Sequence, residues 1–331
     1  MSKGAEEMNA NTKKSIGTFF YKYWLLLFTA LVLLGFGALA PATLGFTNLL
    51  NIASNACLTA IAGIGATCTM CTGDFDLSTG SILTMGCFLM VLFVKDCHMN
   101  YFLAIFLTLV CCALLGLMNA LIHVKLRVPA FCTTFSTQFI LTGLAKLIFN
   151  GTAVLGLSNG TVWYFTFLGQ TYLWGVIPIT VIILIIVSAV MIFFTEHTRS
   201  GKYLYAVGAN PEACTYLGID SGVQKYKGYI IGGLLCGLAG IIDGSMINGC
   251  DPSLGASMMN QASMVVMIGA MFNKVGVFNI PGTIIGALLI SIITNGLVMV
   301  GTPSYVKDWV LGILLFASIG VVNVIRKRIA K

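Results

Sequence analysis

Long apolar runs, broken by short polar stretches, extend along almost the whole chain. Crossing the ~30 Å hydrocarbon core of a bilayer takes ~20 helical residues, and a helix satisfies its own backbone hydrogen bonds in lipid. Such runs lie at about residues 24–40, 51–72, 80–95, 101–123, 129–149, 172–194, 229–248, 262–273, 280–300 and 307–325. The pattern predicts an all-α polytopic membrane protein with about ten transmembrane helices. Five crossings per half would allow two inverted halves.

Two of these runs leave alternatives open. The run at 262–273 is too short to span unaided, so the helix there is tilted, longer than the apolar run, or re-entrant. The first run ends in Ala38-Leu39-Ala40, which is similar to a secretory cleavage site. Because Pro41 would make a poor start for a mature chain, we expect the first helix to be retained.

The composition excludes an ordinary soluble domain. Hydrophobic residues make up 58% of the 331 residues and charged residues only 9%, against about 45–50% and about 25% in soluble domains. No phosphate-binding loop of the form GxxxxGK followed by Ser or Thr occurs, so we do not expect the chain to hydrolyse ATP by itself. Cys68 and Cys71 stand without a second pair, and the histidines lie near segment ends. We therefore expect no catalytic, cofactor or metal site in this chain.

The net charge of +7 is spread between the apolar runs, which indicates the positive-inside bias of membrane proteins and not a nucleic-acid surface. With a cytoplasmic N-terminus, 15 of the 18 basic residues fall inside, and only Lys95, Lys146 and Lys307 fall on or near the outside. This predicts a cytoplasmic N-terminal segment at 1–23, one transmembrane domain at 24–325 with a cytoplasmic loop at 195–228, and a basic cytoplasmic tail at 326–331.

The cytoplasmic loop contains the signals of a short helix. Asn210 suits an N-cap, Pro211 the first helical position, Glu212 the positive helix end and Gly218 a C-terminal stop. A helix of about two turns is marginal in water and needs a docking partner. A simple connecting turn is the alternative interpretation.

The residues Glu212-Ala213-Cys214, followed after three residues by Gly218, resemble the EAA---G signature of ABC importer permeases, with Cys in place of the second Ala. The flanking GKYLYAVGAN at 201–210 is similar to the ribose/galactose/xylose branch, which also handles autoinducer-2. The resemblance implies that a separate ABC ATPase, which binds the ATP, docks on this helix. The implied coupling residues are Asn210, Pro211, Glu212, Ala213, Cys214 and Gly218.

Two upstream motifs carry the same resemblance. Residues 72–81, TGDFDLSTGS, are similar to the GG-x-DLS-x-GS element of that branch, with Asp74 where a small residue is usual. Val128-Pro-Ala-Phe131 is similar to the start of its PxF-x-x-T-L-G element. Carboxylates so close to the membrane are costly unless hydrated or hydrogen-bonded. Asp76 or Ser78 therefore either caps the third helix or, with Asp74, lines the transport pathway.

Further polar residues lie within or beyond the later helices. Asp243 is well inside a predicted membrane helix and should face the protein interior or water, as a structural acid or a pathway residue. Glycines four residues apart, such as Gly240 and Gly244, predict close helix packing within the subunit or at a subunit interface. The candidate pathway residues are Asp74, Asp76, Ser78, Asp243, Asn248, Asp251 and Asn295.

Together these features predict the transmembrane permease subunit of an ATP-driven importer of simple sugars in the bacterial inner membrane. The resemblance implies a periplasmic or lipid-anchored sugar-binding protein and a second permease chain, identical or related, as partners. The alternative is a secondary transporter or channel for a small polar solute, which would need intramembrane charge pairs or broken helices.

The predicted topology can be checked by labelling single cysteines in a cysteine-free background with an impermeant thiol reagent. Arg199→Cys and Lys225→Cys should be protected from outside, and Ser158→Cys should be labelled, because the positive-inside bias places 195–228 in the cytoplasm and 150–171 outside. Labelling of the first two with a silent Ser158→Cys would reverse the orientation.

Overall fold

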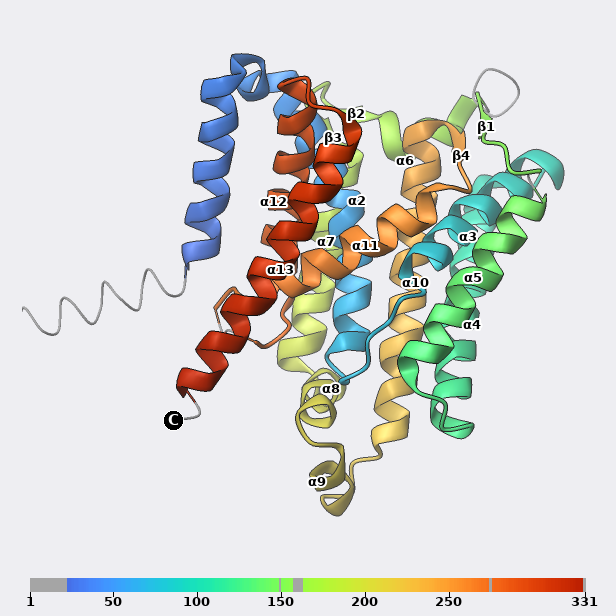
Figure 1. The fold of residues 1–331 in the computed structure, drawn as a ribbon. Helices are drawn as coiled ribbons and strands as arrows, with labels where there is room; N and C mark the ends of the chain where they lie inside the picture. Colours follow the sequence, from blue (N-terminus) through green and yellow to red (C-terminus); the bar gives the residue numbers. More distant parts are fainter. Residues whose placement is uncertain (1–22, 149, 157–162, 274–275, 330–331) are drawn as a thin grey trace, which may run out of the picture.

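The computed structural model of this chain describes residues 23–148, 150–156, 163–273 and 276–329. It is a bundle of helices (Figure 1). Predictions for the N-terminal segment up to residue 22, for the end of the tail, and for Ser158 and Lys274 fall outside the described residues.

The long helices follow the apolar runs. They are a helix at Tyr23–Leu39, α2 (Phe46–Met70), α3 (Thr79–Val91, continued by a π turn at Leu92–Asp96), α4 (Tyr101–Lys125), α5 (Ala130–Ile148), α7 (Ile179–His197), α10 (Ser221–Ile247), α11 (Leu254–Gly269), α12 (Ile280–Met299) and α13 (Ser304–Ile329). In the described part of the chain, seven of them are long and apolar enough to cross a membrane: α2, α3 with its π turn, α4, α5, α7, α10 and α12.

Short elements connect these helices. They are 3-10 turns at Pro41–Leu44 and Trp163–Thr166, the helices α6 (Phe167–Gln170), α8 (Arg199–Ala209) and α9 (Pro211–Tyr216), and two antiparallel strand pairs, β1 (Val154–Leu155) with β4 (Gly249–Cys250) and β2 (Tyr172–Leu173) with β3 (Ile177–Pro178). Figure 1 shows α8 and α9 at one end of the bundle and the strand pairs at the other.

Three segment boundaries differ most from the predicted ones. The segment predicted at 172–194 begins as α7 at Ile179, because the β2–β3 pair occupies the preceding residues. The helix predicted at 229–248 begins at Ser221, where Asp220 accepts a hydrogen bond from the amide of Val223 (3.2 Å) and caps α10. Most of the short run at 262–273 belongs to α11, which starts at Leu254 because polar residues before the apolar run are also helical. Helix α11 runs obliquely in Figure 1.

Helix α10 lies against α2, α3 and α4, and small residues permit the close approach. A methyl group on Gly240 would overlap the carbonyl oxygen of Leu83 on α3, and one on Gly233 would overlap that of Cys112 on α4. On α12, a methyl group on Gly282 would overlap the carbonyl oxygen of Gly269. The predicted small-residue faces therefore pack within one subunit, as small residues do in membrane helix pairs.

The outward faces of α4, α5 and α7 carry large apolar side chains. Phe102, Phe139 and Ile185 are 79%, 64% and 62% exposed. A water-soluble protein would rarely display such a continuous apolar surface. These faces suit the hydrocarbon of a bilayer. The many hydrophobic residues of the sequence are therefore divided between the core and the lipid-facing surface.

Replacing Gly240 by Ala should destabilise the bundle by about 1–3 kcal/mol, because the new methyl group overlaps the backbone of α3. The matched control is Gly143→Ala on α5, where nothing lies within 4 Å of the added carbon. It should be neutral or slightly stabilising, since Ala favours helix over Gly. Thermal unfolding of both variants in detergent measures the difference, and equal midpoints would contradict the packing.

Candidate functional site

The connection between α7 and α10 is built of two capped short helices. The Thr198 hydroxyl accepts a hydrogen bond from the amide of Gly201 (3.1 Å) and begins α8. The Asn210 side chain accepts from the amide of Ala213 (3.0 Å) and begins α9. Pro211 occupies the first turn of α9, where its missing N–H is not needed. The loop thus contains the short helix that the sequence signals indicated, and not a simple turn.

Helix α9 ends in a tight left-handed turn at Gly218, whose φ is +75°. The amide of Gly218 donates to the carbonyl of Thr215 (3.0 Å), and the amide of Ile219 donates to that of Cys214 (2.9 Å). These two bonds form a Schellman motif, in which glycine at the left-handed position avoids a clash of the β-carbon. Asp220 then caps α10 directly, so no slack chain separates α9 from the long helix.

The tip of α9 projects from the end of the bundle (Figure 1). Within α9, whose residues are all described, Cys214 is the buried side chain. Tyr216 and Leu217 are 91% and 77% exposed. An aromatic and an aliphatic side chain held out on a rigidly capped turn, beyond the apolar bundle, form a surface suited to a protein partner.

Helix α8 joins this projection to the bundle. A methyl group on Gly208 would overlap the carbonyl oxygen of Cys71, so the end of α8 lies in backbone contact with the start of the α2–α3 connection, residues 71–78. The ammonium of Lys227 on α10 donates to the hydroxyl of Ser200 on α8 (2.8 Å). A displacement of α9 would therefore be passed through α8 to residues 71–78 and to α10.

The 71–78 segment has irregular backbone between two buried helices, and side chains of α5 satisfy part of it. The amide of Leu77 donates to the Thr134 hydroxyl (3.1 Å), and just beyond the segment, in the first turn of α3, the amide of Ser81 donates to Oε1 of Gln138 (3.0 Å). Buried backbone that is not helical is stable only where such partners exist. These bonds hold the segment against α5.

Asp76 and Ser78 are also buried, and both form hydrogen bonds. Oδ1 of Asp76 accepts from the amide and the hydroxyl of Ser78 (2.8 and 2.7 Å), and the Ser78 hydroxyl accepts from Nδ2 of Asn119 on α4 (2.8 Å). Ser78 precedes α3 but makes no side-chain cap bond. The predicted cap is thus replaced by a local Asp–Ser turn, because Ser78 has helical backbone angles and turns its hydroxyl toward Asp76.

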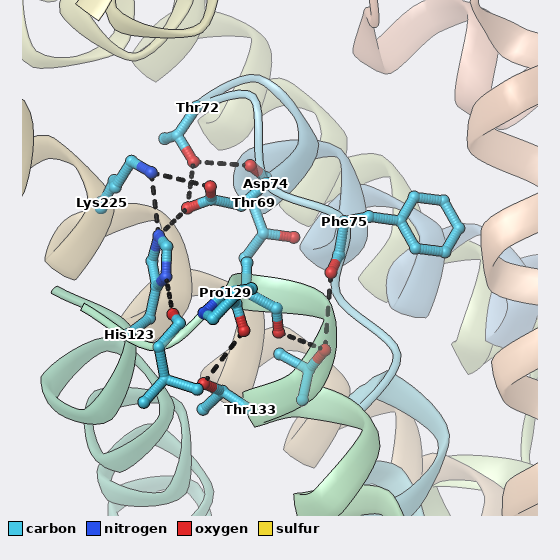
Figure 2. A network of polar contacts seen from close by, with 11 residues as sticks. Thr69, Thr72, Asp74, Phe75, His123, Pro129, Thr133 and Lys225 are labelled. Atoms are coloured by element: carbon cyan, nitrogen blue, oxygen red, sulfur yellow. Dashed lines mark hydrogen bonds and ion pairs between the residues drawn. The ribbon is translucent and has the colours of Figure 1, made fainter. Parts of the chain in front are cut away.

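Asp74 forms an ion cluster with two basic side chains from separate helices (Figure 2). Its Oδ1 lies 2.7 Å from the ammonium of Lys225 on α10, and its Oδ2 lies 3.2 Å from Nε2 of His123 on α4. The carboxylate is 7% exposed. Burial raises the pKa of Asp74, but hydrogen bonds from His123 and Lys225 outweigh it and hold the pKa below its ordinary value.

The imidazole of His123 is fixed by its second nitrogen. Nδ1 lies 2.7 Å from the carbonyl oxygen of Val128, so Nδ1 carries a proton and donates it. Nε2 faces both the Asp74 carboxylate and the Lys225 ammonium, which lies 2.9 Å away. When neutral, Nε2 accepts from Lys225; when protonated, it donates to Asp74. Either state keeps the 71–78 segment tied to α4 and α10.

The other predicted pathway residues do not join this cluster. Asp243 is 5% exposed within α10, which agrees with its predicted interior position. Asn248 ends α10 in the left-handed conformation (φ 53°), and Asp251 accepts bonds from the amide and hydroxyl of Ser253 (2.8 and 2.7 Å). Asn295, on α12, exchanges two hydrogen bonds with Asn48 on α2 (2.9 and 3.0 Å).

His123 and Lys225 are the site residues that sequence reasoning missed. His123 ends one helix and Lys225 begins another, positions that the helix dipole or the positive-inside bias already accounts for. The sequence feature that could have indicated a basic partner was Asp74 itself. A carboxylate where a small residue is usual needs buried cations nearby, but the sequence does not show which ones.

This chain is similar over most of its length to known transport permeases. A family model described as "Branched-chain amino acid transport system / permease component" matches residues 48–319. The ribose import permease protein RbsC of Escherichia coli (strain K12) is 31% identical over 92% of this chain and 96% of its own length. RbsC of Bacillus subtilis (strain 168) is 30% identical over 85% of this chain and 86% of its own, and the D-allose transport system permease protein AlsC of E. coli (strain K12) is 27% identical over 96% and 97%.

This chain belongs to the ABC importer permease family. Within it, the similar proteins lie in the ribose, allose and autoinducer-2 branch, since LsrD of the autoinducer 2 import system is also 28% identical over 88% of this chain. No solved structure gives a significant match. The family description names amino acids and the individual relatives name sugars, so the family by itself does not decide what this permease carries.

In this permease, Asp74→Asn should lower the stability by about 1–3 kcal/mol, because it leaves two half-buried basic groups without their carboxylate. Thermal unfolding at pH 7 measures the effect. The control Asp308→Asn, at an exposed carboxyl of α13, should leave the midpoint unchanged.

A double-mutant cycle separates the ion pair from other effects of the substitution. Asp74→Asn combined with Lys225→Met should cost less than the sum of the single changes, because the second change removes the cation that the first leaves unpaired. Strict additivity would show that the two side chains do not interact in the folded protein.

Proposed function

We propose that this permease is the membrane-spanning subunit of an ATP-driven, binding-protein-dependent importer of a small sugar in the bacterial inner membrane. Two observations support it. The relatives that the chain matches over nearly their full length are import permeases for ribose, allose and autoinducer 2. Helix α9 presents a rigid, exposed docking tip at the end of the bundle.

The helix order supports ten crossings with both termini in the cytoplasm. We assign one crossing each to the helix at 23–39 and to α2, α3, α4, α5, α7, α10, α11, α12 and α13. Under this assignment α8, α9 and the Asp74 cluster lie on the cytoplasmic side, where the basic residues of the chain are concentrated. The strand pairs and α6 lie outside.

The proposed partners follow from this arrangement. A separate ABC ATPase binds and hydrolyses ATP and receives the tip of α9, because the sequence contains no phosphate-binding loop of the form GxxxxGK followed by Ser or Thr. A periplasmic or lipid-anchored binding protein delivers the sugar on the opposite side. A second permease chain, identical or related, completes the membrane unit.

Coupling runs through the contacts of α8. Movement of the ATPase displaces α9, whose caps prevent it from unwinding. The backbone contact at Gly208 passes the displacement to the 71–78 segment, and the Lys227–Ser200 bond passes it to α10. The Asp74 cluster binds that segment to α4 and α10, so these elements move as a unit and not one by one.

Gly218→Val should abolish most ATP-dependent uptake, because a β-branched residue is disfavoured at φ +75° and would distort the turn that orients α9. Glu212→Gln should have little effect, since shape and not charge defines the docking tip. The matched control is Gly301→Val, at φ +78° in open space on the opposite end. Uptake and ATPase activity are measured in liposomes with the cognate ATPase and binding protein.

The outcomes separate the proposed function from its alternative. Loss of uptake and of binding-protein-stimulated ATPase in Gly218→Val, with normal membrane abundance and normal Gly301→Val, supports docking through α9. Sugar uptake by the wild-type permease without any ATPase would instead identify a secondary transporter or channel.

A further inference from the structure

Two adjoining hollows lie at the end of the bundle opposite α9. One has a volume of about 350 Å³ and is lined by α2, α11, α12 and Lys307 of α13. The other has a volume of about 560 Å³ and is lined by α2, α12, Met246 of α10 and residues around Gln170. Asn55 and Asn295 line both hollows, so the two form one continuous depression. We call it the amide basin.

The side walls of the amide basin are held in place by a reciprocal amide pair. Nδ2 of Asn48 donates to Oδ1 of Asn295 (2.9 Å), and Nδ2 of Asn295 donates to Oδ1 of Asn48 (3.0 Å). Asn48 also donates to the carbonyl of Thr43 (2.9 Å), and the Ser291 hydroxyl donates to the carbonyl of Ile52 (2.8 Å). These bonds join α2 to α12 along the basin and fix its shape.

Three other amides of the basin have hydrogen-bonding groups that no described residue occupies. The side chains of Asn51, Asn55 and Gln261 make no hydrogen bond with any residue that the structure describes. Each offers two N–H donors and one carbonyl acceptor. They come from two helices, α2 and α11, that face one another across the hollow. A ligand with several hydroxyl groups could pair with them in both directions.

The charge of the lining restricts the ligand class. None of the lining residues, all of which are described, is acidic, and Lys307 is the basic one among them. This contrasts with the cytoplasmic end, where Asp74 is neutralised by two basic groups. Apolar side chains such as Leu58, Met258 and Val298 complete the wall. Amides with interspersed apolar carbon suit the hydroxyl and C–H faces of a neutral polyol.

We propose that the amide basin receives a neutral, polyhydroxylated small molecule from the outer side and holds it before it crosses the permease. The inference rests on the proposed import function and assigns the residues that contact the cargo. The volume of each of the two hollows is within the ~300–1,000 Å³ range of small-molecule sites. Exposed, uncharged amides give weak binding, which suits a site that must release its occupant as readily as it takes it up.

The test removes one amide at a time from opposite walls. Asn55→Leu and Gln261→Leu each delete free donors and an acceptor without breaking a hydrogen bond inside the protein. The matched control is Asn260→Leu, an exposed amide on α11 next to Gln261 that does not line the basin. D-ribose and D-allose serve as probes in liposomes that contain the permease, the ATPase and the binding protein.

Each basin variant should lower sugar uptake per ATP hydrolysed by about two- to tenfold, the effect of one lost hydrogen bond. The ratio of ribose to allose uptake should also shift, because the two sugars place their hydroxyls differently. ATPase stimulation by the loaded binding protein should stay at the wild-type level, as should every measurement on Asn260→Leu.

A direct measurement does not depend on transport. The permease alone in nanodiscs should show saturation-transfer NMR signals on the ring protons of D-ribose at millimolar concentration, and Asn55→Leu combined with Gln261→Leu should lose them. Unchanged signals and unchanged uptake per ATP in the variants would refute the basin while leaving the import function intact. A change in the binding-protein concentration needed for ATPase stimulation would instead assign the basin to protein docking.

Failure of the proposed function has a different signature. If the wild-type complex imports neither sugar although the loaded binding protein stimulates ATP hydrolysis, the sugar assignment fails. The basin inference fails with it, unless the nanodisc signals from D-ribose persist and require Asn55 and Gln261.

Discussion

Buried backbone amides and carbonyls must find partners inside the protein, and this constraint acts on the 71–78 segment, where the chain is not helical. The chain leaves helical geometry between α2 and α3. On α5, Thr134 accepts from the amide of Leu77 in this connection, and Gln138 accepts from the amide of Ser81 in the first turn of α3. The side chains of the segment are held as well, by Asn119 on α4 and Lys225 on α10. One irregular segment is therefore bonded to three long helices, and it holds them together at the end of the bundle that carries α8 and α9.

The Asp74 cluster is a consequence of the same constraint. A buried carboxylate is costly unless it is paired or hydrogen-bonded, and the two basic partners of Asp74 come from α4 and α10. The contact of Gly208 with Cys71 places α8 against the segment that carries Asp74. The attachment of α8 and of the 71–78 segment to the long helices therefore depends on charge pairing as well as on close packing.

The two ends of the bundle have different chemistry. The end with α8 and α9 combines an exposed aromatic tip with paired charges, which suits a rigid protein partner and the transmission of force. The opposite end has uncharged amides, several of which have no partner among the described residues, and this suits weak and reversible contact with a small polar molecule. The bundle between them is closed by glycine contacts that leave little room for independent helix movement.

The sequence by itself determined the features that depend on neighbouring residues. Apolar run length predicts the membrane helices, and the caps at Asn210 and Gly218 predict α9, because hydrophobic length and capping are local properties. Helix boundaries were less certain where polar residues continue a helix, as at the start of α11. Only the tertiary structure decided which distant side chains meet. Lys225 lies 151 residues from Asp74, and Asn295 lies 247 residues from Asn48, and helix packing brings each pair together without any mark in the local pattern.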